Sequence, residues 1–267
     1  MEQHNPTTAY DEQMGFEARF EWGIDGVRRL APVSDVVVVV DVLSFSTCVD
    51  VAVSRGAAVF PYRWRDASAE RFAHEKDALL AVSRSQMTPE HPYSLSPTSL
   101  EALPHGARIV LPSPNGATLA VHVADSGAAV IAGCLRNAGA VAAAARSLGQ
   151  TVTVIAAGER WDGGGEPLRP AVEDMVGAGA ILAAFRPKTP SPEAIAAIAV
   201  YAAAAAAMQP FIAACSSGRE LLQLGYGADV DTATQHDVSE TVPLFKDGAF
   251  TSSPPAPLHR RTDFAMS

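Results

Sequence analysis

The stretch DVVVVVDVLSFST, residues 35–47, contains the feature that decides the fold. Its five consecutive valines, residues 36–40, are continuously hydrophobic rather than alternating with polar residues. That pattern is typical of a strand buried on both faces, as in a parallel sheet. Asp41 follows the valines directly, at the carboxyl end of the predicted strand, which is where open α/β sheets bind their ligands. We therefore expect a core strand that carries an acid to the functional edge of a sheet.

Predicted strands and helices alternate over most of the chain. The expected strands are residues 15–23, 35–43, 57–62, 107–113, 128–134 and 151–158. The expected helices are residues 24–32, one that begins near Ser46, and residues 67–85, 115–126, 137–149, 171–185 and 191–208, with loops at 85–106 and 162–170. This alternation predicts an α/β fold with a mixed or parallel sheet and helices on both faces. We expect flexible tails at residues 1–13 and 252–267 around one unit, residues 14–251, that can consist of two lobes.

Composition narrows the possible partners. The chain has 267 residues, of which 48% are hydrophobic and 18% charged, and this excludes disorder over most of its length. Its net charge of −9 does not favour nucleic acid or an anionic membrane, whereas clustered carboxylates would attract a divalent cation. We expect a small anionic phosphorylated substrate as the partner, and a homo-oligomer is left open.

Cysteine usage and hydrophobic runs predict a cytoplasmic protein. The three cysteines are far apart and lack CxxC spacing, which is typical of reduced thiols. The longest apolar run, residues 194–208, is mostly alanine and is shorter than a membrane span. The first residues are polar and acidic, unlike a signal peptide.

Polar side chains follow several predicted strands. After the strand at 107–113 come a serine, an asparagine and a glycine, and after 151–158 come an acid and an arginine. Carboxylates suit Mg²⁺, while arginines and free N–H groups at helix N-termini suit phosphate. The candidates at these ends are Asp41, Ser44, Ser46, Thr47, Ser113, Asn115, Gly116, Glu159 and Arg160.

Several of these features also have a purely structural interpretation. Ser46 and Thr47 can cap a helix, and the Asn-Gly pair at 115–116 can be an ordinary turn. Glu159 and Arg160 can form a surface ion pair. The segment SSGREL, residues 216–221, can cradle an anion or begin a helix. No HxxxH, HExxH, GxGxxG or Walker A pattern is present, so neither a zinc centre nor a nucleotide motif is predicted.

Five segments in order resemble the 2-phosphosulfolactate phosphatase family over roughly residues 16–250. They are DVLSFSTCVDVAVSRGA, LPSPNGATLA, CLRNAGAVA, VIAAGERW with LRPAVEDMVGAGAI, and SSGRELLQLGYGADVDTA with DVSETVPLF. The resemblance implies two lobes with the active site between them. It also implies Mg²⁺-dependent hydrolysis of (R)-2-phospho-3-sulfolactate to 3-sulfolactate and phosphate, in some organisms a step toward coenzyme M.

The resemblance also implies roles for individual residues. Asp41, Glu173 and Asp174 are the expected metal ligands, although the last two acids can equally complement a helix dipole. Asp41, Asn115 and Glu159 are the expected catalytic residues. The attacking group is either a water activated by the metal or Asp41 itself. The expected substrate-binding residues are Ser44, Ser46, Thr47, Ser113, Gly116, Arg160, Arg169 and Arg219.

Ser44 is the one notable departure from the family pattern. Many members carry arginine at this position, and serine cannot supply the charge that would hold a phosphate or sulfonate. Arg160, Arg169 and Arg219 are the candidates to replace it. The alternatives are therefore a phosphatase for another small 2-phospho acid and a non-catalytic anion-binding protein of the same fold.

Overall fold

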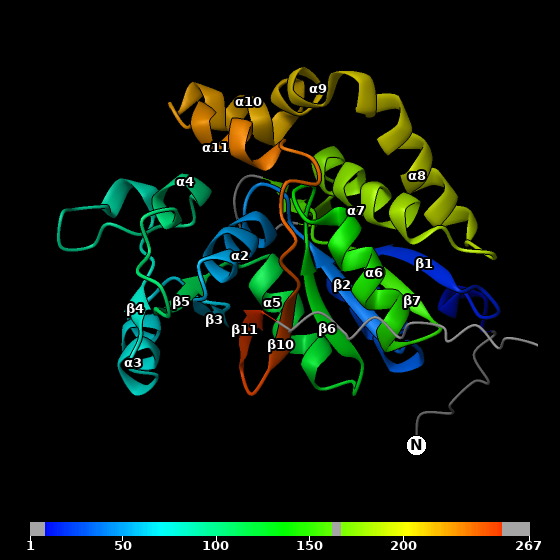
Figure 1. Ribbon diagram of the computed structural model, residues 1–267, viewed down its shortest axis with the longest axis horizontal. Helices are drawn as coiled ribbons and strands as arrows, with labels where there is room; N and C mark the ends of the chain where they lie inside the picture. Colours follow the sequence, from blue (N-terminus) through cyan, green and yellow to red (C-terminus); the bar gives the residue numbers. More distant parts are fainter. Residues whose placement is uncertain (1–8, 162–166, 253–267) are drawn as a thin grey trace, which may run out of the picture.

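One nine-stranded sheet forms the centre of the molecule (Figure 1). The computed structural model describes residues 9–161 and 167–252. The strand order is β1-β7-β2-β6-β10-β11-β3-β5-β4, and β8 and β9 form a separate hairpin. The strands are β1 Ala18–Trp22, β2 Val36–Val40, β3 Ala58–Tyr62, β4 Leu79–Leu80, β5 Arg108–Pro112, β6 Ala129–Gly133, β7 Val152–Ala156, β8 Glu159–Arg160, β9 Leu168–Arg169, β10 Pro243–Lys246 and β11 Ala249–Ser252.

The sheet consists of two parallel halves joined by an antiparallel hairpin. β1, β7, β2 and β6 run parallel to one another, and so do β3, β5 and β4. β10 and β11 lie between the halves and pair antiparallel with β6 and β3. The expected mixed α/β sheet is confirmed, and the two parallel halves share one continuous sheet. Three successive antiparallel pairings separate the halves, so the strands of one half run opposite to those of the other. The chain segments that follow β2 and β5 nevertheless meet, because the N–H of Gly116 donates to the carboxylate of Asp41.

The five valines of β2 supply both faces of the core. Val37 and Val39 belong to the cluster on one face, and Val36, Val38 and Val40 belong to the cluster on the other. All five are fully buried, because β2 pairs with β6 on one side and with β7 on the other. Side chains alternate across a strand, so a strand covered on both faces needs hydrophobic residues at every position.

Helices cover both faces of the sheet, as predicted. α6 and α7 pack on one face, with α8 against α7, while α1, α2 and α5 pack on the other. The helices are α1 Gly23–Leu30, α2 Phe45–Ser54, α3 Ala67–Glu75, α4 Pro97–Leu100, α5 Gly116–Ala124, α6 Ala138–Leu148, α7 Val172–Phe185, α8 Pro192–Ala204, α9 Met208–Ala214, α10 Ser216–Gln223 and α11 Gly227–Ala233.

The helix predicted at residues 67–85 is wrong beyond its first half. α3 ends at Glu75, and Asp77 adopts a left-handed backbone conformation with φ of 47°. The chain then pairs as β4 with the edge of β5, and a 3-10 helix begins at Arg84. Pairing with the edge of β5 therefore replaces the second half of the predicted helix, and Arg84 follows a strand instead of lying on a helix.

Three other expectations need smaller corrections. The loop predicted at 85–106 contains α4, and the helix predicted at 191–208 is divided into α8, a 3-10 turn and the start of α9. The hairpin β10–β11 was not predicted. Its turn at Asp247 and Gly248, with φ of 53° and 85°, is an Asp-Gly turn that favours hairpins.

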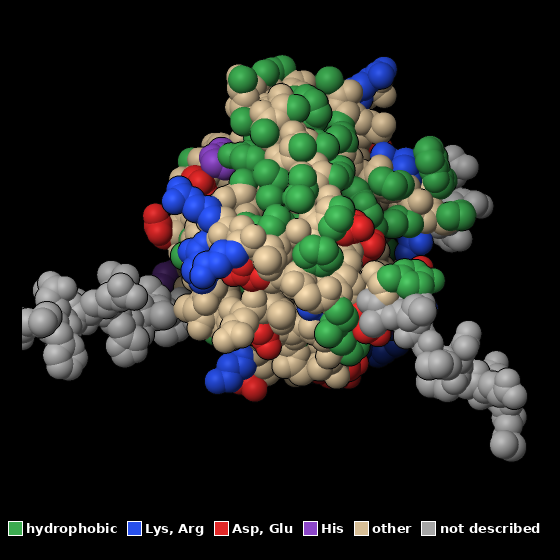
Figure 2. Space-filling view, turned by 90° about the vertical axis from the view of Figure 1, so that its right-hand side faces the viewer, with side chains coloured by type: hydrophobic (Ala, Val, Ile, Leu, Met, Phe, Trp, Pro, Cys, Tyr) green, Lys and Arg blue, Asp and Glu red, His purple; other side chains and the backbone are tan. Residues whose placement is uncertain are grey.

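The segment Pro192–Ala214 is apolar enough and long enough to cross a membrane by composition alone. In the structure it is bent between α8 and α9, and α8 packs against α7 and β1 (Figure 1). Figure 2 shows hydrophobic side chains gathered on the side of the molecule that carries α8. Ile195 contributes to that surface with 53% of its area exposed. That the protein has no membrane partner stays a prediction, and so does the possibility that it forms a homo-oligomer.

The predicted tails fall largely outside the described residues. Residues 1–8 and 253–267 are not described, and neither is most of the glycine-rich loop predicted at 162–170. Within the predicted tail, residues 9–12 form a 3-10 helix, and the buried side chain of Gln13 exchanges hydrogen bonds with the backbone of Phe20.

Candidate active site

Asp41 lies at the carboxyl end of β2, where two backbone N–H groups hold its carboxylate. The N–H of Phe45 donates to Oδ1 at 3.0 Å, and the N–H of Gly116 donates to Oδ2 at 2.9 Å. These donors are the first residues of α2 and α5, whose N-termini favour negative charge. The acid is only 5% exposed. The structure therefore fixes Asp41 as an oriented carboxylate at the sheet edge.

Gly116 is required by its close approach to this acid. A Cβ atom at position 116 would lie 2.8 Å from Oδ2 of Asp41 and would overlap the ring of Phe45. Both contacts are shorter than van der Waals packing allows. The Asn-Gly pair is therefore more than a turn, because it lets a backbone N–H reach the carboxylate.

The hydroxyls of Ser46 and Thr47 face the backbone of the loop that follows β2. Ser46 Oγ donates to the carbonyl of Asp41 at 2.8 Å and accepts from its N–H at 2.9 Å. Thr47 Oγ1 donates to the carbonyl of Val42 at 2.8 Å. Both side chains are fully buried. Their hydroxyl protons thus hold the loop. This role is structural, but it is not the helix cap that was expected, because the N-cap residue of α2 is Ser44.

The acidic pair of α7 lies beside the same loop. Asp174 accepts the N–H of Val42 at 2.7 Å and the N–H of Gly158 at 2.9 Å. Glu173 accepts a hydrogen bond from Sγ of Cys215 at 3.2 Å. Both acids are almost completely buried. Asp174 therefore connects the loops after β2 and β7 and lies at the same edge as Asp41.

Glu159 and Asn115 meet across the site. Asn115 follows β5 and donates from Nδ2 to Oε2 of Glu159 at 2.9 Å. Glu159 follows β7 in the short strand β8 and is half-buried. The two residues predicted to be catalytic from separate strand ends are thus brought together, and the hydrogen bond orients the carboxylate.

The crowded acids repel one another. Burial raises the pKa of Asp41, which the charge of Glu173 raises further, although the N–H groups of Phe45 and Gly116 oppose this. Burial and the charges of Asp41 and Glu173 raise the pKa of Asp174 well above its usual value. Burial, followed by the charge of Asp41, raises the pKa of Glu159 to about 7. None of the ion pairs between described residues includes these acids.

The raised pKa of Glu159 predicts how stability depends on pH without a divalent cation. The folded protein holds a proton on Glu159 up to about pH 7, whereas a glutamate in the unfolded chain loses it near pH ~4.3. The folded state therefore binds more protons between these values, and stability falls as pH rises through them. In EDTA, we expect the melting temperature to drop by a few degrees more from pH 5.5 to pH 8 in the wild type than in Glu159→Gln. Parallel melting profiles for the two proteins would refute the assignment.

The donor set at this edge is compatible with Mg²⁺. Within residues 9–161 and 167–252, no three His, Cys, Asp or Glu side chains converge into a preformed metal site. Mg²⁺ commonly takes one or two carboxylates and fills its remaining positions with water and phosphate oxygens, so it does not need a third. Buried acids that have raised pKa values and form no ion pair with a described residue would gain from such an ion. The residues therefore fit a magnesium ion shared with a phosphate.

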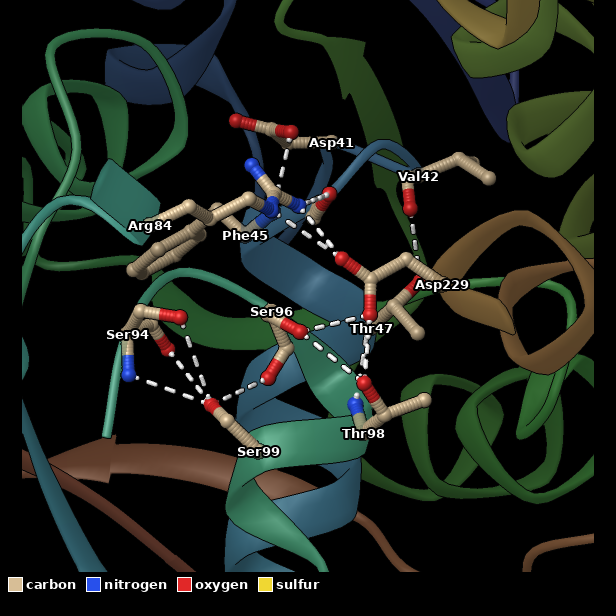
Figure 3. A network of polar contacts seen from close by, with 11 residues as sticks. Asp41, Val42, Phe45, Thr47, Arg84, Ser94, Ser96, Thr98, Ser99 and Asp229 are labelled. Atoms are coloured by element: carbon tan, nitrogen blue, oxygen red, sulfur yellow. Dashed lines mark hydrogen bonds and ion pairs between the residues drawn. The ribbon is translucent and has the colours of Figure 1, made fainter. Parts of the chain in front are cut away.

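Arg84 follows β4, in the other half of the sheet, and reaches the loop that follows β2. Its Nη2 donates to Oγ of Ser44 at 3.0 Å, and it forms an ion pair with Asp229 at 2.9 Å. Figure 3 shows the guanidinium between Asp229 and the loop that carries Asp41. Nε and Nη2 make these bonds, and no described residue accepts from Nη1. Arg84 thus brings a positive charge to the hydroxyl of Ser44, with two N–H donors left for a ligand.

A second arginine, Arg65, follows β3. Arg65 is exposed overall, yet partial desolvation lowers the pKa of its guanidinium. The negative charge of Asp41 opposes this lowering of the pKa, and the positive charge of Arg84 adds to it. Arg65 is therefore within electrostatic range of both the acid and the other arginine. Two cations that repel each other face acids that also repel one another. An anion beside a metal ion would relieve both.

The sequence profile of the 2-phosphosulpholactate phosphatase (2-phosphosulfolactate phosphatase) family matches residues 27–248, which is most of the chain. The chain belongs to this family. It is accordingly a phosphatase that hydrolyses a phosphomonoester, and its substrate is a small phosphorylated molecule. No curated protein matches the chain.

The arginines that were predicted to assist this phosphatase lie in different places. Arg169 is half-buried in β9, donates to Oγ of Ser217 at 3.3 Å and lowers the pKa of Glu159 slightly, so it lies near the site. Arg160 is exposed on the same hairpin. Arg219 is exposed on α10, which Cys215 caps by accepting the N–H of Gly218. The segment SSGREL therefore begins a helix, the second of its two interpretations.

Two functional candidates of the phosphatase were missed, Arg65 and Arg84. Arg84 was hidden because the pattern of residues 67–85 resembles an amphipathic helix. Arg65 comes three residues after the short strand β3, in the run RWRD, and this position after a strand was an available signal. Ser113 was predicted correctly at a strand end, but it is 1% exposed and its N–H donates to the carbonyl of Tyr62.

Proposed function

We propose that this phosphatase hydrolyses (R)-2-phospho-3-sulfolactate to 3-sulfolactate and inorganic phosphate, with Mg²⁺ as its cofactor. The observation that carries the proposal is the division of the site into an acidic half, around Asp41, and a basic half, around Arg84. The acidic half suits a metal ion and the phosphoryl group. The basic half suits the carboxylate and sulfonate that remain on the product.

In this proposal, the acids of the first half hold the cofactor. Asp41, Glu173 and Asp174 are the candidate ligands, and the N–H groups on Asp41 and Asp174 fix their orientation. When bound, Mg²⁺ would neutralise negative charge on the phosphoryl oxygens. The three acids are nearly fully buried, so they exclude bulk water from that side of the phosphoryl group.

Glu159 is the proposed general base. Its pKa of about 7 suits a group that must accept a proton near neutral pH. Asn115 binds only Oε2 among the described residues, which leaves Oε1 to accept a proton from water. The oxygen of that water bonds to phosphorus, the ester P–O bond breaks, and the leaving alkoxide takes up a proton to become the hydroxyl of sulfolactate.

Arg84 and Arg65 are proposed to hold the two other anionic groups of the substrate. Arginine forks bind carboxylates and sulfonates through parallel hydrogen bonds. The contact of Arg84 with Ser44 places its charge at the position where many family members carry arginine. The missing arginine at position 44 would thus be replaced from β4 instead of from the segments at Arg160, Arg169 or Arg219.

Release of phosphate from a set of phosphorylated 2-hydroxy acids tests this function. We expect turnover of 2-phospho-3-sulfolactate with Mg²⁺, loss of turnover in EDTA, and recovery when Mg²⁺ is restored. Faster turnover of another 2-phospho acid would change the substrate and keep the chemistry. Undiminished turnover in EDTA would refute the role of Mg²⁺. Stabilisation by ligands without any turnover would favour a binding protein.

A further inference from the structure

A large cavity adjoins the basic half of the site. Its volume is about 1040 Å³, and it lies between α3 with the β4 loop on one side and α10 with the start of α11 on the other. Arg65 and Arg84 form part of its wall, as does Pro112 at the end of β5. The acidic cluster around Asp41 does not line it. The two arginines therefore lie between the cavity and the acidic part of the proposed substrate site.

The lining of the cavity is more apolar than polar, although four acids, Asp66, Glu70, Glu90 and Glu220, also belong to it. Ala69 and Ala73 of α3, Leu80 of β4, Leu95 and Leu221 all line it. At its other side, Leu224 is 61% exposed, which leaves a large hydrophobic side chain in contact with solvent. An apolar ligand would gain free energy from covering this surface.

Tyr226 connects the apolar wall to the charged end. The guanidinium of Arg84 lies 5.0 Å from the centre of the Tyr226 ring, and both residues line the cavity. The stacked ring limits the directions from which an anion can reach the guanidinium. A ligand with an acidic group at Arg84 would thus direct the rest of its chain along Tyr226 into the cavity.

The size of the cavity exceeds the need of a three-carbon substrate. Sites for drug-sized ligands usually enclose roughly 300–1000 Å³, and this cavity of about 1040 Å³ lies beside the reacting edge instead of including it. We propose that it binds an apolar chain on the third carbon of 2-phosphooxy carboxylic acids, so that the phosphatase also accepts substrates longer than phosphosulfolactate. This inference rests on the proposed function, because it uses the same orientation of the substrate.

Chain length provides the test. The probes are 2-phosphooxy derivatives of propanoate, pentanoate and octanoate, each assayed for phosphate release with Mg²⁺. We expect kcat/KM to rise with chain length, by roughly three- to fourfold for each methylene group that becomes fully buried. A kcat/KM that is independent of chain length, or falls with it, would overturn the proposal.

Leu224 and Leu222 form a matched pair of variants. Both leucines are exposed at the end of α10, but only Leu224 lines the cavity. Leu224→Asp should lower the ratio of kcat/KM for the octanoate over the propanoate substrate by tenfold or more, because a charge would face the chain. Leu222→Asp should leave that ratio unchanged. Equal effects of the two variants would contradict the location.

Binding of alkylphosphonates separates this inference from the proposed function. Calorimetry with ethyl-, butyl- and octylphosphonate should show affinity that rises with length in the wild type and less so in Leu224→Asp. That result without hydrolysis of any 2-phosphooxy acid would keep the cavity assignment and refute the phosphatase substrate. Hydrolysis of phosphosulfolactate without any length dependence in either assay would keep the proposed function and refute the cavity assignment.

Discussion

Replacing Asp41 with asparagine should lower kcat for phosphate release by at least about 10³-fold. The variant removes the negative charge at the point where the loops after β2, β5 and β7 meet. The carboxylate now accepts hydrogen bonds from the N–H groups of Phe45 and Gly116. In the variant, the NH₂ group of asparagine would face one of these two donors. Loss of an electrostatic contact to the transition state commonly costs ~10²–10³, and loss of a metal ligand adds to this. Steady-state kinetics at saturating Mg²⁺ measure the effect.

Asp35→Asn is the matched control for this variant. Asp35 precedes β2 at its amino end and accepts N–H groups of Gln150 and Thr151, so it also holds backbone at an end of the same strand. We expect its kcat to stay within about twofold of the wild type. The melting temperature of Asp41→Asn should stay within a few degrees of the wild type, since removing one charge from the acidic cluster offsets the lost hydrogen bond. Asp35 lies outside that cluster, so Asp35→Asn gains no such offset and should lower the melting temperature more. Full activity of Asp41→Asn would remove this residue from the mechanism.

Replacing Asp229 with asparagine should destabilise the protein by about 2–3 kcal/mol, because Arg84 would lose its counter-charge in a largely buried position. Asp229 is 2% exposed and Arg84 18% exposed at their side chains. The same carboxylate accepts the hydroxyl protons of Ser96 at 2.6 Å and Thr98 at 2.8 Å, so the variant also weakens the network in Figure 3. Urea denaturation monitored by circular dichroism gives the change in the free energy of unfolding.

The Asp229 variant should also affect catalysis. With its partner altered, the guanidinium of Arg84 is held less firmly beside Ser44, and KM should rise by tenfold or more with a smaller change in kcat. Asp231→Asn is the control, because Asp231 is an exposed aspartate of the same helix, α11, and Gln209 is the one described residue that donates to its carboxylate. We expect it to change stability by less than about 0.5 kcal/mol. A similar loss in both variants would show that the network does not depend on Asp229.

The central part of the fold was predictable because its signals are local. Five consecutive valines can satisfy both faces of a sheet, and helical patterns follow the strands at regular intervals. The acids of the site were predictable for the same reason. Asp41 directly follows its strand and Glu159 closely follows its own. Both are therefore predicted by the rule that ligands bind at the carboxyl ends of strands.

The basic half of the site was not predictable in the same way. β4 contains only Leu79 and Leu80, and it forms because the edge of β5 offers hydrogen bonds at that point. Nothing within residues 67–85 shows that a strand edge lies nearby, so the helical pattern predicts one helix that includes Arg84. The partner of Arg84, Asp229, lies 145 positions away, and only the folded chain shows that contact.

The roles of the hydroxyls were also beyond the sequence. Ser46 and Thr47 follow an acid at a helix start, a pattern that suits phosphate binding and helix capping equally. Their direction decides between these roles, and both donate to backbone carbonyls of the same loop. Ser44 differs, since its hydroxyl meets Arg84. In the proposed function, the position that lacks the arginine is thus the position to which Arg84 brings its charge.

A crystal soaked with Mg²⁺ and 3-sulfolactate tests the central claim most directly. The account predicts an ion coordinated by Asp41 and at least one acid of the pair Glu173 and Asp174. It also predicts the carboxylate or sulfonate of the product within hydrogen-bond distance of Arg84. An ion bound at another place, or a product bound away from both arginines, would contradict the division of the site into a metal half and an anion half.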